Sequence, residues 1–291
     1  PGNALVEDVA TLVPVELTDI AGLVTAAATW PADLVVVGPE AVLAAGLSDA
    51  LAAAGITVLG PSQAATRIEA SKSFARELME ACRIPMARGE SFDDPAAAIR
   101  HVEAAPGPVV IKADGLAKGK GVVLPANRRE AARVIERFMV EEVLGAAGRV
   151  VVIEEALRGR ELSFQVLAHG HAIVPLPVAR DFKRLREGDQ GPNTGGMGAV
   201  SAPGLLSDPE RCAIGATIIR PLLDLLERRG MPYCGVLYAG LMMTPDGPKV
   251  LEFNVRPGDP ETQCVVSRIE GNMSDVLWRC AKGELEEATL Q

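Results

Sequence analysis

An acid and an amide lie side by side in a strand-like run late in the chain. Glu252 and Asn254 are two residues apart, with apolar residues alternating around them. Side chains two apart in a strand point to the same face, so their oxygens would form a small polar patch. Such a patch suits Mg²⁺, which takes few protein oxygens and fills its other positions with water and phosphate oxygens. Arg256 continues this face and could hold a phosphate or carboxylate through two hydrogen bonds. The run could also be a surface strand with its polar residues in solvent.

A glycine- and lysine-rich turn between two apolar runs is the second chemical signal. Gly115, Gly119 and Gly121 would expose backbone N–H groups, and Lys118 and Lys120 add positive charge. This combination suits an oligophosphate. The spacing is not that of a Walker A loop, and a mobile hairpin tip with solubilising lysines remains an alternative.

Lys112 closes the apolar run that precedes this turn. A lysine at the end of a buried strand needs an anionic or aromatic partner, because an unpaired buried ammonium is costly. Lys112 is therefore a candidate ligand for a phosphate or a base.

Two further stretches combine charge with open backbone. Glu154, Glu155 and Leu157 follow a buried strand and could present backbone groups to a planar base, while Glu161 could accept hydrogen bonds from ribose hydroxyls. A solvated acidic turn is the alternative. Residues 191–198 form a glycine-rich run typical of close approach to a ligand, or of a linker. Charged residues precede that run, namely Asp181, Lys183, Arg184 and Arg186.

The composition of the chain narrows the range of functions that it could have. The chain has 291 residues and a net charge of -9, which argues against a general nucleic-acid or membrane-surface binder. The five cysteines show no zinc-site or redox spacing, so we expect reduced and mostly buried thiols in a cytosolic protein. We find no membrane-spanning run and no signal peptide. The chain opens without Met, and we expect it to be a fragment of a longer protein.

Hydrophobic periodicity predicts the elements that would position these residues. Apolar runs at 34–37 and 56–59 flank a helix over 40–54, a β-α-β pattern that predicts a parallel doubly wound sheet. Its ligand edge would carry Gly38, Pro39 and Glu40 together with residues 60–62, although both segments could also be simple turns. The remaining expectations are a helix or helix pair over 62–83, helices from 95, 127, 208 and 260, strands over 109–112, 122–124 and 150–153, hairpins 162–178 and 235–255, and an irregular loop over 180–198.

These motifs, in this order, resemble the ATP-grasp superfamily, and within it the phosphoribosylamine–glycine ligase family. The resemblance covers essentially the whole chain, and the runs 191–198 and 258–261 are its most specific parts. The other matching segments are 37–40, 60–61, 71–72, 111–117, 119–121, 153–155, 238–240 and 252–256.

The resemblance implies an α/β and α+β architecture, with two α+β subdomains that clasp ATP. It places a partial doubly wound domain at 1–70 and an ATP-grasp domain at 71–291, with a mobile lid at about 88–156. A C-terminal family domain is expected to be missing. The implied reaction joins glycine to 5-phosphoribosylamine through a glycyl phosphate, in purine biosynthesis in the cytoplasm. By this resemblance we expect ATP and Mg²⁺ or Mn²⁺ to be required, no nucleic acid or membrane partner, and a monomer or weak homodimer.

The resemblance also assigns roles to residues. Arg256, Lys112 and Lys120 would be catalytic, and Glu252 and Asn254 would bind the metal. The nucleotide would contact Lys72, Lys112, Gly115, Lys118, Gly119, Lys120, Gly121, Glu154, Glu155, Leu157 and Glu161. The other substrates would contact Gly38, Pro39, Glu40, Asp181, Lys183, Pro192, Asn193, Thr194, Gly195, Gly196, Met197, Arg256, Gly258 and Asp259.

The chain departs from the family pattern at three places. Phe182 stands where a His is expected and Pro257 where a Phe is expected, and the strand over 236–243 lacks the second metal acid of many superfamily members. Two alternatives stay open: another ATP-grasp carboxylate–amine ligase, and a nucleotide-binding module without turnover.

Overall fold

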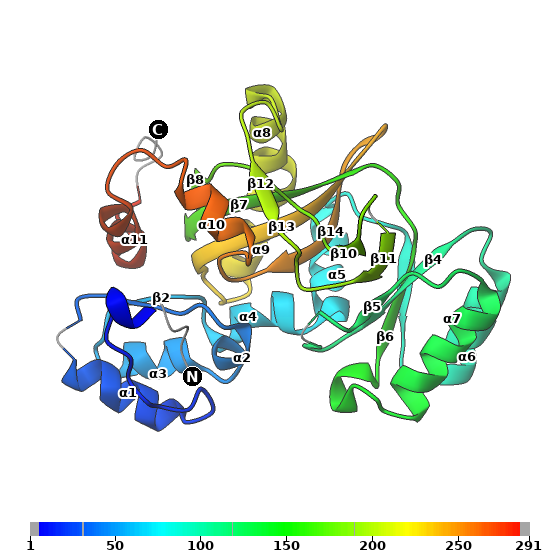
Figure 1. Ribbon diagram of the computed structural model, residues 1–291, viewed down its shortest axis with the longest axis horizontal. Helices are drawn as coiled ribbons and strands as arrows, with labels where there is room; N and C mark the ends of the chain where they lie inside the picture. The colour runs from blue at the N-terminus through cyan, green and yellow to red at the C-terminus, as the bar shows by residue number, and fades with distance from the viewer. Residues whose placement is uncertain (1–5, 31, 118, 189, 286–291) are drawn as a thin grey trace.

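The computed structural model describes residues 6–30, 32–117, 119–188 and 190–285, arranged as an N-terminal unit, a central sheet and a second, smaller sheet (Figure 1). In the N-terminal unit β1 pairs in parallel with β2, which confirms the predicted β-α-β pattern. Its elements are η1 (Val6–Asp8), α1 (Ile20–Thr29), β1 (Val35–Val36), α2 (Glu40–Ala44), α3 (Leu47–Ala53) and β2 (Val58–Leu59). No helix within the described ranges is long and apolar enough to cross a membrane.

The prediction of a single helix over 40–54 is wrong. The chain breaks into α2 and α3 at Gly46, whose φ of 87° lies in the left-handed region that favours glycine. The apolar pattern runs through the break because Leu43 and Leu47 both face the core. The next segment is a helix pair, α4 (Gln63–Ala70) and α5 (Lys72–Cys82), separated by Ser71, whose side chain caps α5 at Phe74 N.

The second sheet is antiparallel, in the order β3-β6-β4-β5. Its strands are β3 (Gly89–Phe92), β4 (Val109–Ala113), β5 (Val122–Val123) and β6 (Val151–Glu155). Its helical segments are α6 (Pro95–Ala104), α7 (Arg128–Ile135), η2 (Glu136–Val140) and η3 (Gly145–Gly148). Asp94 and Asn127 cap α6 and α7 as the sequence predicts, and α6, α7 and η2 bury a separate core against the strands. Strand β3 was not predicted.

The central sheet has the order β12-β9-β7-β13-β14, with β8 paired to β7, where β9 is Ala179–Asp181 and β12 is Ala199–Ser201. The predicted hairpins are confirmed as β7 (Arg160–His169) with β8 (Ala172–Pro175), and β13 (Cys234–Thr244) with β14 (Gly247–Asn254). The remaining helices are α8 (Asp208–Ile214), η4 (Gly215–Ile219), α9 (Arg220–Arg228), α10 (Glu261–Val266) and α11 (Met273–Lys282).

The prediction of an irregular loop over 180–198 is wrong. Strand β9 (Ala179–Asp181) pairs with β12 (Ala199–Ser201), and β10 (Arg184–Arg186) pairs with β11 (Gln190–Asn193). Polar and glycine residues hide the strand pattern here, because backbone pairing rather than apolar alternation holds these short strands.

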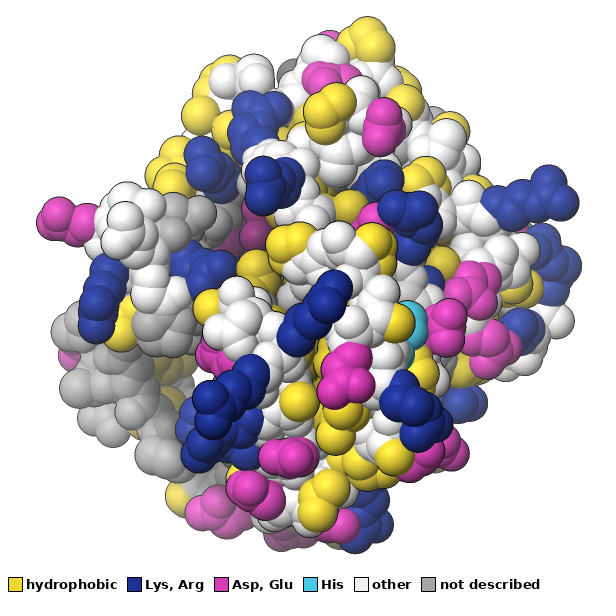
Figure 2. Space-filling view, turned by 90° about the vertical axis from the view of Figure 1, so that its right-hand side faces the viewer, with side chains coloured by type: hydrophobic (Ala, Val, Ile, Leu, Met, Phe, Trp, Pro, Cys, Tyr) yellow, Lys and Arg dark blue, Asp and Glu magenta, His cyan; other side chains and the backbone are white. Residues whose placement is uncertain are grey.

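One face of the central sheet is apolar, and the other is polar where Glu161, Ser163 and Glu252 lie but apolar at its far end, where Leu167 and Val236 belong to another core. Leu162, Phe164, Leu237, Ala239 and Phe253 are at most 3% exposed and belong to the core that includes residues of α5 and α9. Alternate residues of the same strands point to the opposite face. Over the space-filling surface in Figure 2, basic and acidic side chains are interspersed among apolar ones.

Glu69 joins α4 to the end of β14. It is 7% exposed, accepts a hydrogen bond from Val255 N at 2.7 Å, and lies 3.4 Å from Arg256 Nη2. Burial raises the pKa of Glu69 from 4.5 to about 7, although Arg256 and the Val255 N–H oppose the rise.

We expect Glu69→Gln to change how stability depends on pH. The unfolded chain releases this proton near pH 4.5, whereas the folded chain holds it to about pH 7. The stability of the native chain relative to the variant should therefore fall as pH rises through that window, by about 3 kcal/mol. Urea denaturation at several pH values measures this difference. Parallel stability curves for the two proteins would show that Glu69 ionises normally.

Candidate active site

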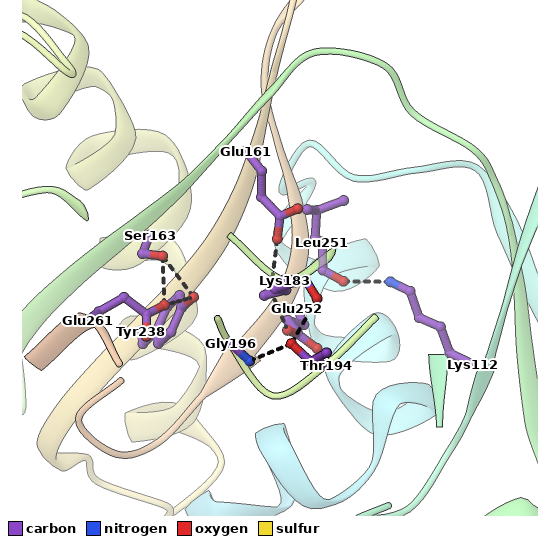
Figure 3. A network of polar contacts seen from close by, with 10 residues as sticks. All are labelled: Lys112, Glu161, Ser163, Lys183, Thr194, Gly196, Tyr238, Leu251, Glu252 and Glu261. Carbon is purple, nitrogen blue, oxygen red and sulfur yellow. Dashed lines mark hydrogen bonds and ion pairs between the residues drawn. The ribbon is translucent and has the colours of Figure 1, made fainter. Parts of the chain in front are cut away.

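The polar face of the central sheet brings several predicted residues together (Figure 3). Ser163 on β7 and Glu252 on β14 both pair with Gly240 of β13, and Gln165 and Asn254 both pair with Tyr238. Gly240 carries no side chain between Ser163 and Glu252, and a Cβ there would lie 3.4 Å from Glu252 Cγ. Glu161 lies one row further along β7.

Glu252 is surrounded by cations. Lys183 Nζ lies 3.6 Å from its carboxylate and 2.8 Å from that of Glu161. Burial acts to raise the pKa of Glu252, but Lys183, Lys72, Lys112 and Arg256 outweigh it and lower the pKa to about 2. Glu252 is therefore ionised, as a metal ligand must be.

The donor set at 252 and 254 fits a hard divalent cation. It offers one ionised carboxylate and one amide on the same strand face, and both residues remain partly exposed. No group of three or more His, Cys, Asp or Glu suited to a metal occurs among the described residues. The site would thus leave several metal positions for water and phosphate oxygens.

Lys112 connects the second sheet to the central one. Its Nζ forms a 2.7 Å ion pair with Glu154 and donates to the carbonyl oxygen of Leu251, also at 2.7 Å. Leu251 lies at a register shift in the β13–β14 ladder, where Gly240 pairs with Glu252 but Leu241 pairs with Val250. A bulge of this kind frees a backbone group from the ladder. Lys112 is thereby held next to Glu252, although the two are far apart in sequence.

The neighbouring acids on β6 point in different directions. Glu154 is buried and also pairs with Arg76 at 3.1 Å, whereas Glu155 pairs with the exposed Arg88. Leu157 follows β6 and is half-buried. Of the two acids, only Glu154 meets Lys112.

The glycine–lysine turn lies beside the start of α5 and the glycine-rich strands. Lys72 N donates to the carbonyl oxygen of Asp114, whose carboxylate accepts from Ser71 Oγ and Ser73 N. A Cβ at Gly119 would lie 3.7 Å from Gly195, so the tip of the turn approaches the segment 191–198. Gly115 and Gly121 have no room for a side chain, since a Cβ at either would come within 2.8 Å of an alanine. Lys120 is exposed, and Lys118 lies outside the described residues.

The glycine-rich segment folds back on β9. Thr194 Oγ1 donates to Lys183 O at 2.8 Å and accepts from Gly196 N at 3.1 Å, and a Cβ at Gly196 would lie 3.1 Å from Asp181 Oδ1. Burial, with Glu261 nearby, raises the pKa of Asp181 to about 6 against the opposing effect of Lys183. Met197 is 57% exposed. Pro192 and Asn193 lie in the β11 backbone.

The segment that follows β14 contacts the polar residues of β7 and β13. Glu261 is 2% exposed and accepts hydrogen bonds from Tyr238 Oη at 2.6 Å and Ser163 Oγ at 2.8 Å. Gly258 N donates to Gln165 Oε1 at 3.1 Å. Asp259 points elsewhere, to Gln263.

The guanidinium group of Arg256 lies between the carboxylates of two acids from the N-terminal half of the chain. Its Nε lies 3.2 Å from Glu40 Oε2, and its Nη2 pairs with Glu69. Glu40 begins α2 directly after Gly38 and Pro39, so this turn meets the end of β14.

Sequence reasoning missed several residues that build this site. Ser163 and Gln165 follow Glu161 at alternate positions of β7, and that period of two was a usable signal. Asp114, Arg76 and Glu69 gave no local signal, because each acts through a partner distant in sequence.

Family models match nearly the whole chain. Residues 1–69 match the N domain of phosphoribosylglycinamide synthetase and residues 70–262 match its ATP-grasp (A) domain. A phosphoribosylamine–glycine ligase of Caulobacter vibrioides is 45% identical over 289 residues, which is 99% of this chain and 67% of that protein. The chicken trifunctional purine biosynthetic protein adenosine-3 is 47% identical over 84% of this chain, which spans 24% of that protein.

A solved structure agrees. The crystal structure of phosphoribosylamine–glycine ligase from Thermotoga maritima superposes with a TM-score of 0.85 at 31% identity, covering 100% of this chain and 70% of that one. The predicted ATP-grasp architecture is thus confirmed, and the chain belongs to the phosphoribosylglycinamide synthetase family.

Proposed function

We propose that this chain carries the catalytic unit for ATP-dependent ligation of glycine to 5-phosphoribosylamine, which yields glycinamide ribonucleotide, ADP and phosphate. The observation that carries the proposal is that Lys112, which binds the carbonyl oxygen of Leu251, lies beside Glu252. A cation suited to a phosphate and an acid suited to a metal ion are thereby neighbours. Likeness to curated phosphoribosylamine–glycine ligases over nearly the full chain supports the choice of substrates.

The nucleotide lies between the second sheet and the polar face in this proposal. Lys72, Lys112 and Lys120, with the turn over 115–121, take the phosphates. Glu154, Glu155 and Leu157 take the adenine edge, and Glu161 takes the ribose. The lid at about 88–156 then corresponds to the second sheet and its helices, and 1–70 to the N-terminal unit.

Glu252 and Asn254 would hold Mg²⁺ or Mn²⁺, which would offset the negative charge of the phosphates. The chain's own cations act on the same charge. Lys183 and Arg256 lie close enough to Glu252 to lower its pKa, which supports a role for both in offsetting the charge that would develop on the phosphoryl group. Glu40 and Glu69 orient the guanidinium of Arg256.

The reaction proceeds in two steps. The glycine carboxylate attacks the γ-phosphorus and ADP leaves, giving glycyl phosphate. The amine of phosphoribosylamine then attacks the acyl carbon and phosphate leaves. Exclusion of water by the lid protects the acyl phosphate from hydrolysis. Asp181, Lys183 and the segment 192–197, together with Gly258 and Asp259, would surround the glycine and the amine substrate. Five unpaired cysteines are consistent with the cytosol as the site of this reaction.

A substrate panel distinguishes this function from its alternatives. ADP release is measured with a set of carboxylic acids and amines, each alone and in pairs. We expect release only when glycine and phosphoribosylamine are both present. Release with a different pair would indicate another ATP-grasp ligase, and calorimetric ATP binding without any release would indicate a binding module.

The metal role of Glu252 is tested by Glu252→Gln, which removes the charge but keeps the shape. We expect kcat/KM to fall about a hundredfold or more, because the loss of a charged ligand removes several kcal/mol of transition-state stabilisation. A raised Mg²⁺ requirement should accompany the fall, since the remaining amide ligand is neutral. Steady-state kinetics over a Mg²⁺ titration measure both.

Glu270→Gln serves as the matched control, because Glu270 is an exposed acid on the connection between α10 and α11. It should leave the Mg²⁺ titration unchanged. If Glu252→Gln titrates with Mg²⁺ like the control, Glu252 is not a metal ligand.

A further inference from the structure

A second polar cluster lies at the end of β7 opposite to Glu161, apart from the proposed active site. It surrounds a cavity of about 460 Å³ between the N-terminal unit and the start of β13. One wall includes Ser48 and Asp49 of α3 and Gly60 after β2, and the other includes His169, Cys234 and Lys282. The cysteines are unpaired as expected, but only Cys280 of the five is buried, which corrects that part of the sequence prediction.

Several polar groups surround the sulfur of Cys234. The Cys280 carbonyl oxygen lies 3.8 Å from it, the His169 ring and the Gly60 N–H face it, and the Cys280 thiol donates to the Ala168 carbonyl oxygen at 3.4 Å. His169 pairs directly with Cys234 across β7 and β13, and its Nδ1 donates to the Cys280 carbonyl oxygen at 2.7 Å. Gly235 brings the Gly60 turn close, since a Cβ on it would lie 3.2 Å from Pro61 Cδ.

The cavity also contains an unused polar group. Ser48 Oγ is buried, with the residue 3% exposed, and it has no hydrogen-bond partner among the described residues. A Cβ at Gly60 would lie 2.9 Å from this hydroxyl, so Ser48 faces the same turn that donates to Cys234. The cavity therefore combines a soft nucleophile and a base on one wall with an unpartnered hydroxyl on the other.

We propose that Cys234 is a covalent modification site, a nucleophilic thiol that small electrophiles and hydroperoxides reach through this cavity, with Cys280 as the resolving thiol. His169 takes the proton of Cys234, and the Gly60 N–H stabilises the resulting thiolate. If solvent exposure alone decided which cysteine reacts, the exposed Cys212 on α8 would be modified first.

The oxidative chemistry balances with a hydroperoxide as the oxidant. The Cys234 thiolate attacks the peroxide oxygen, the O–O bond breaks, and hydroxide or alkoxide leaves, so that Cys234 becomes a sulfenic acid. Cys280 then attacks the Cys234 sulfur, an S–S bond forms, and water leaves. Two thiols lose two electrons in total, and the peroxide gains them.

The charges around the cavity support this assignment. Interactions with Cys280, His169 and Gly60 lower the pKa of Cys234 to about 5 although burial opposes them, and Cys234 in turn raises the pKa of His169. The other titratable groups are Asp49 of α3, Cys280 and Lys282 of α11, and Glu227 of α9, which acts on His169. By contrast, burial raises the pKa of both Cys82 and Cys264.

The first experiment alkylates the native chain with iodoacetamide and follows each cysteine by mass spectrometry. A low-pKa thiolate is intrinsically a weaker nucleophile, so the advantage of Cys234 shows best in acid. At about pH 5.5 we expect Cys234 to react on the order of twentyfold faster than the exposed Cys212. Equal or slower reaction of Cys234 at that pH would overturn the proposal.

His169→Asn is the matched variant, because its side-chain amide can still donate to the Cys280 carbonyl oxygen. It should slow Cys234 alkylation at about pH 5.5 by roughly tenfold while Cys212 is unchanged. An unchanged Cys234 rate would remove His169 from the proposal. The readout does not depend on ligase activity, so it stands apart from the proposed function.

The second experiment treats the chain with hydrogen peroxide. We expect a Cys234–Cys280 disulfide in peptides mapped without reduction, and in Cys280→Ser a sulfenic acid at Cys234 that dimedone traps. Oxidation of Cys212 before Cys234, or neither product at Cys234, would contradict the assignment.

Discussion

The buried ammonium of Lys112 is the constraint on which the site depends. An unpaired charge at this depth would be costly, so the lysine must find oxygen partners. It finds one on its own sheet, Glu154, and one across the interface, the Leu251 carbonyl oxygen. The second partner is free because β14 bulges at that residue. A local irregularity in one strand thus fixes how the second sheet meets the central sheet, beside Glu252.

Charge balance then explains why an acidic protein can build a site for phosphates. The chain carries a net charge of -9, yet Lys183, Lys72, Lys112 and Arg256 all act on Glu252. Acids in turn hold these cations in place, with Glu161 binding Lys183 and Glu40 and Glu69 binding Arg256. The positions of these charges matter more than the net charge of the chain, because interactions between close neighbours in a partly buried site are screened least.

The sequence predicted those parts of the fold that depend on local pattern. Caps at Asp94 and Asn127, the β13–β14 hairpin and the parallel β1–β2 pair follow from residue type and spacing. The break at Gly46 was missed because glycine interrupts a helix without interrupting the apolar stripe. Strands β9 to β12 were missed because backbone pairing holds them. At the site, Glu252, Asn254 and Lys112 carried local signals, whereas Asp114, Arg76 and Glu69 depend on partners brought close only by folding.

The strands that build the candidate site also build the thiol cluster, and their geometry keeps the two apart. β7 presents Glu161, Ser163 and Gln165 toward the polar face and ends at His169, while β13 begins at Cys234 and continues to Tyr238 and Gly240. The two strands pair continuously from Cys234–His169 to Met243–Arg160, so one hydrogen-bonded ladder joins the thiol cluster to the candidate site without an intervening loop. A covalent bond between Cys234 and Cys280 would tie the start of β13 to α11, which Lys282 already links to the N-terminal unit through Thr57. The N-terminal unit also supplies Glu40 to Arg256. The cavity and the candidate site therefore share the same two structural supports, the β7–β13 ladder and the N-terminal unit.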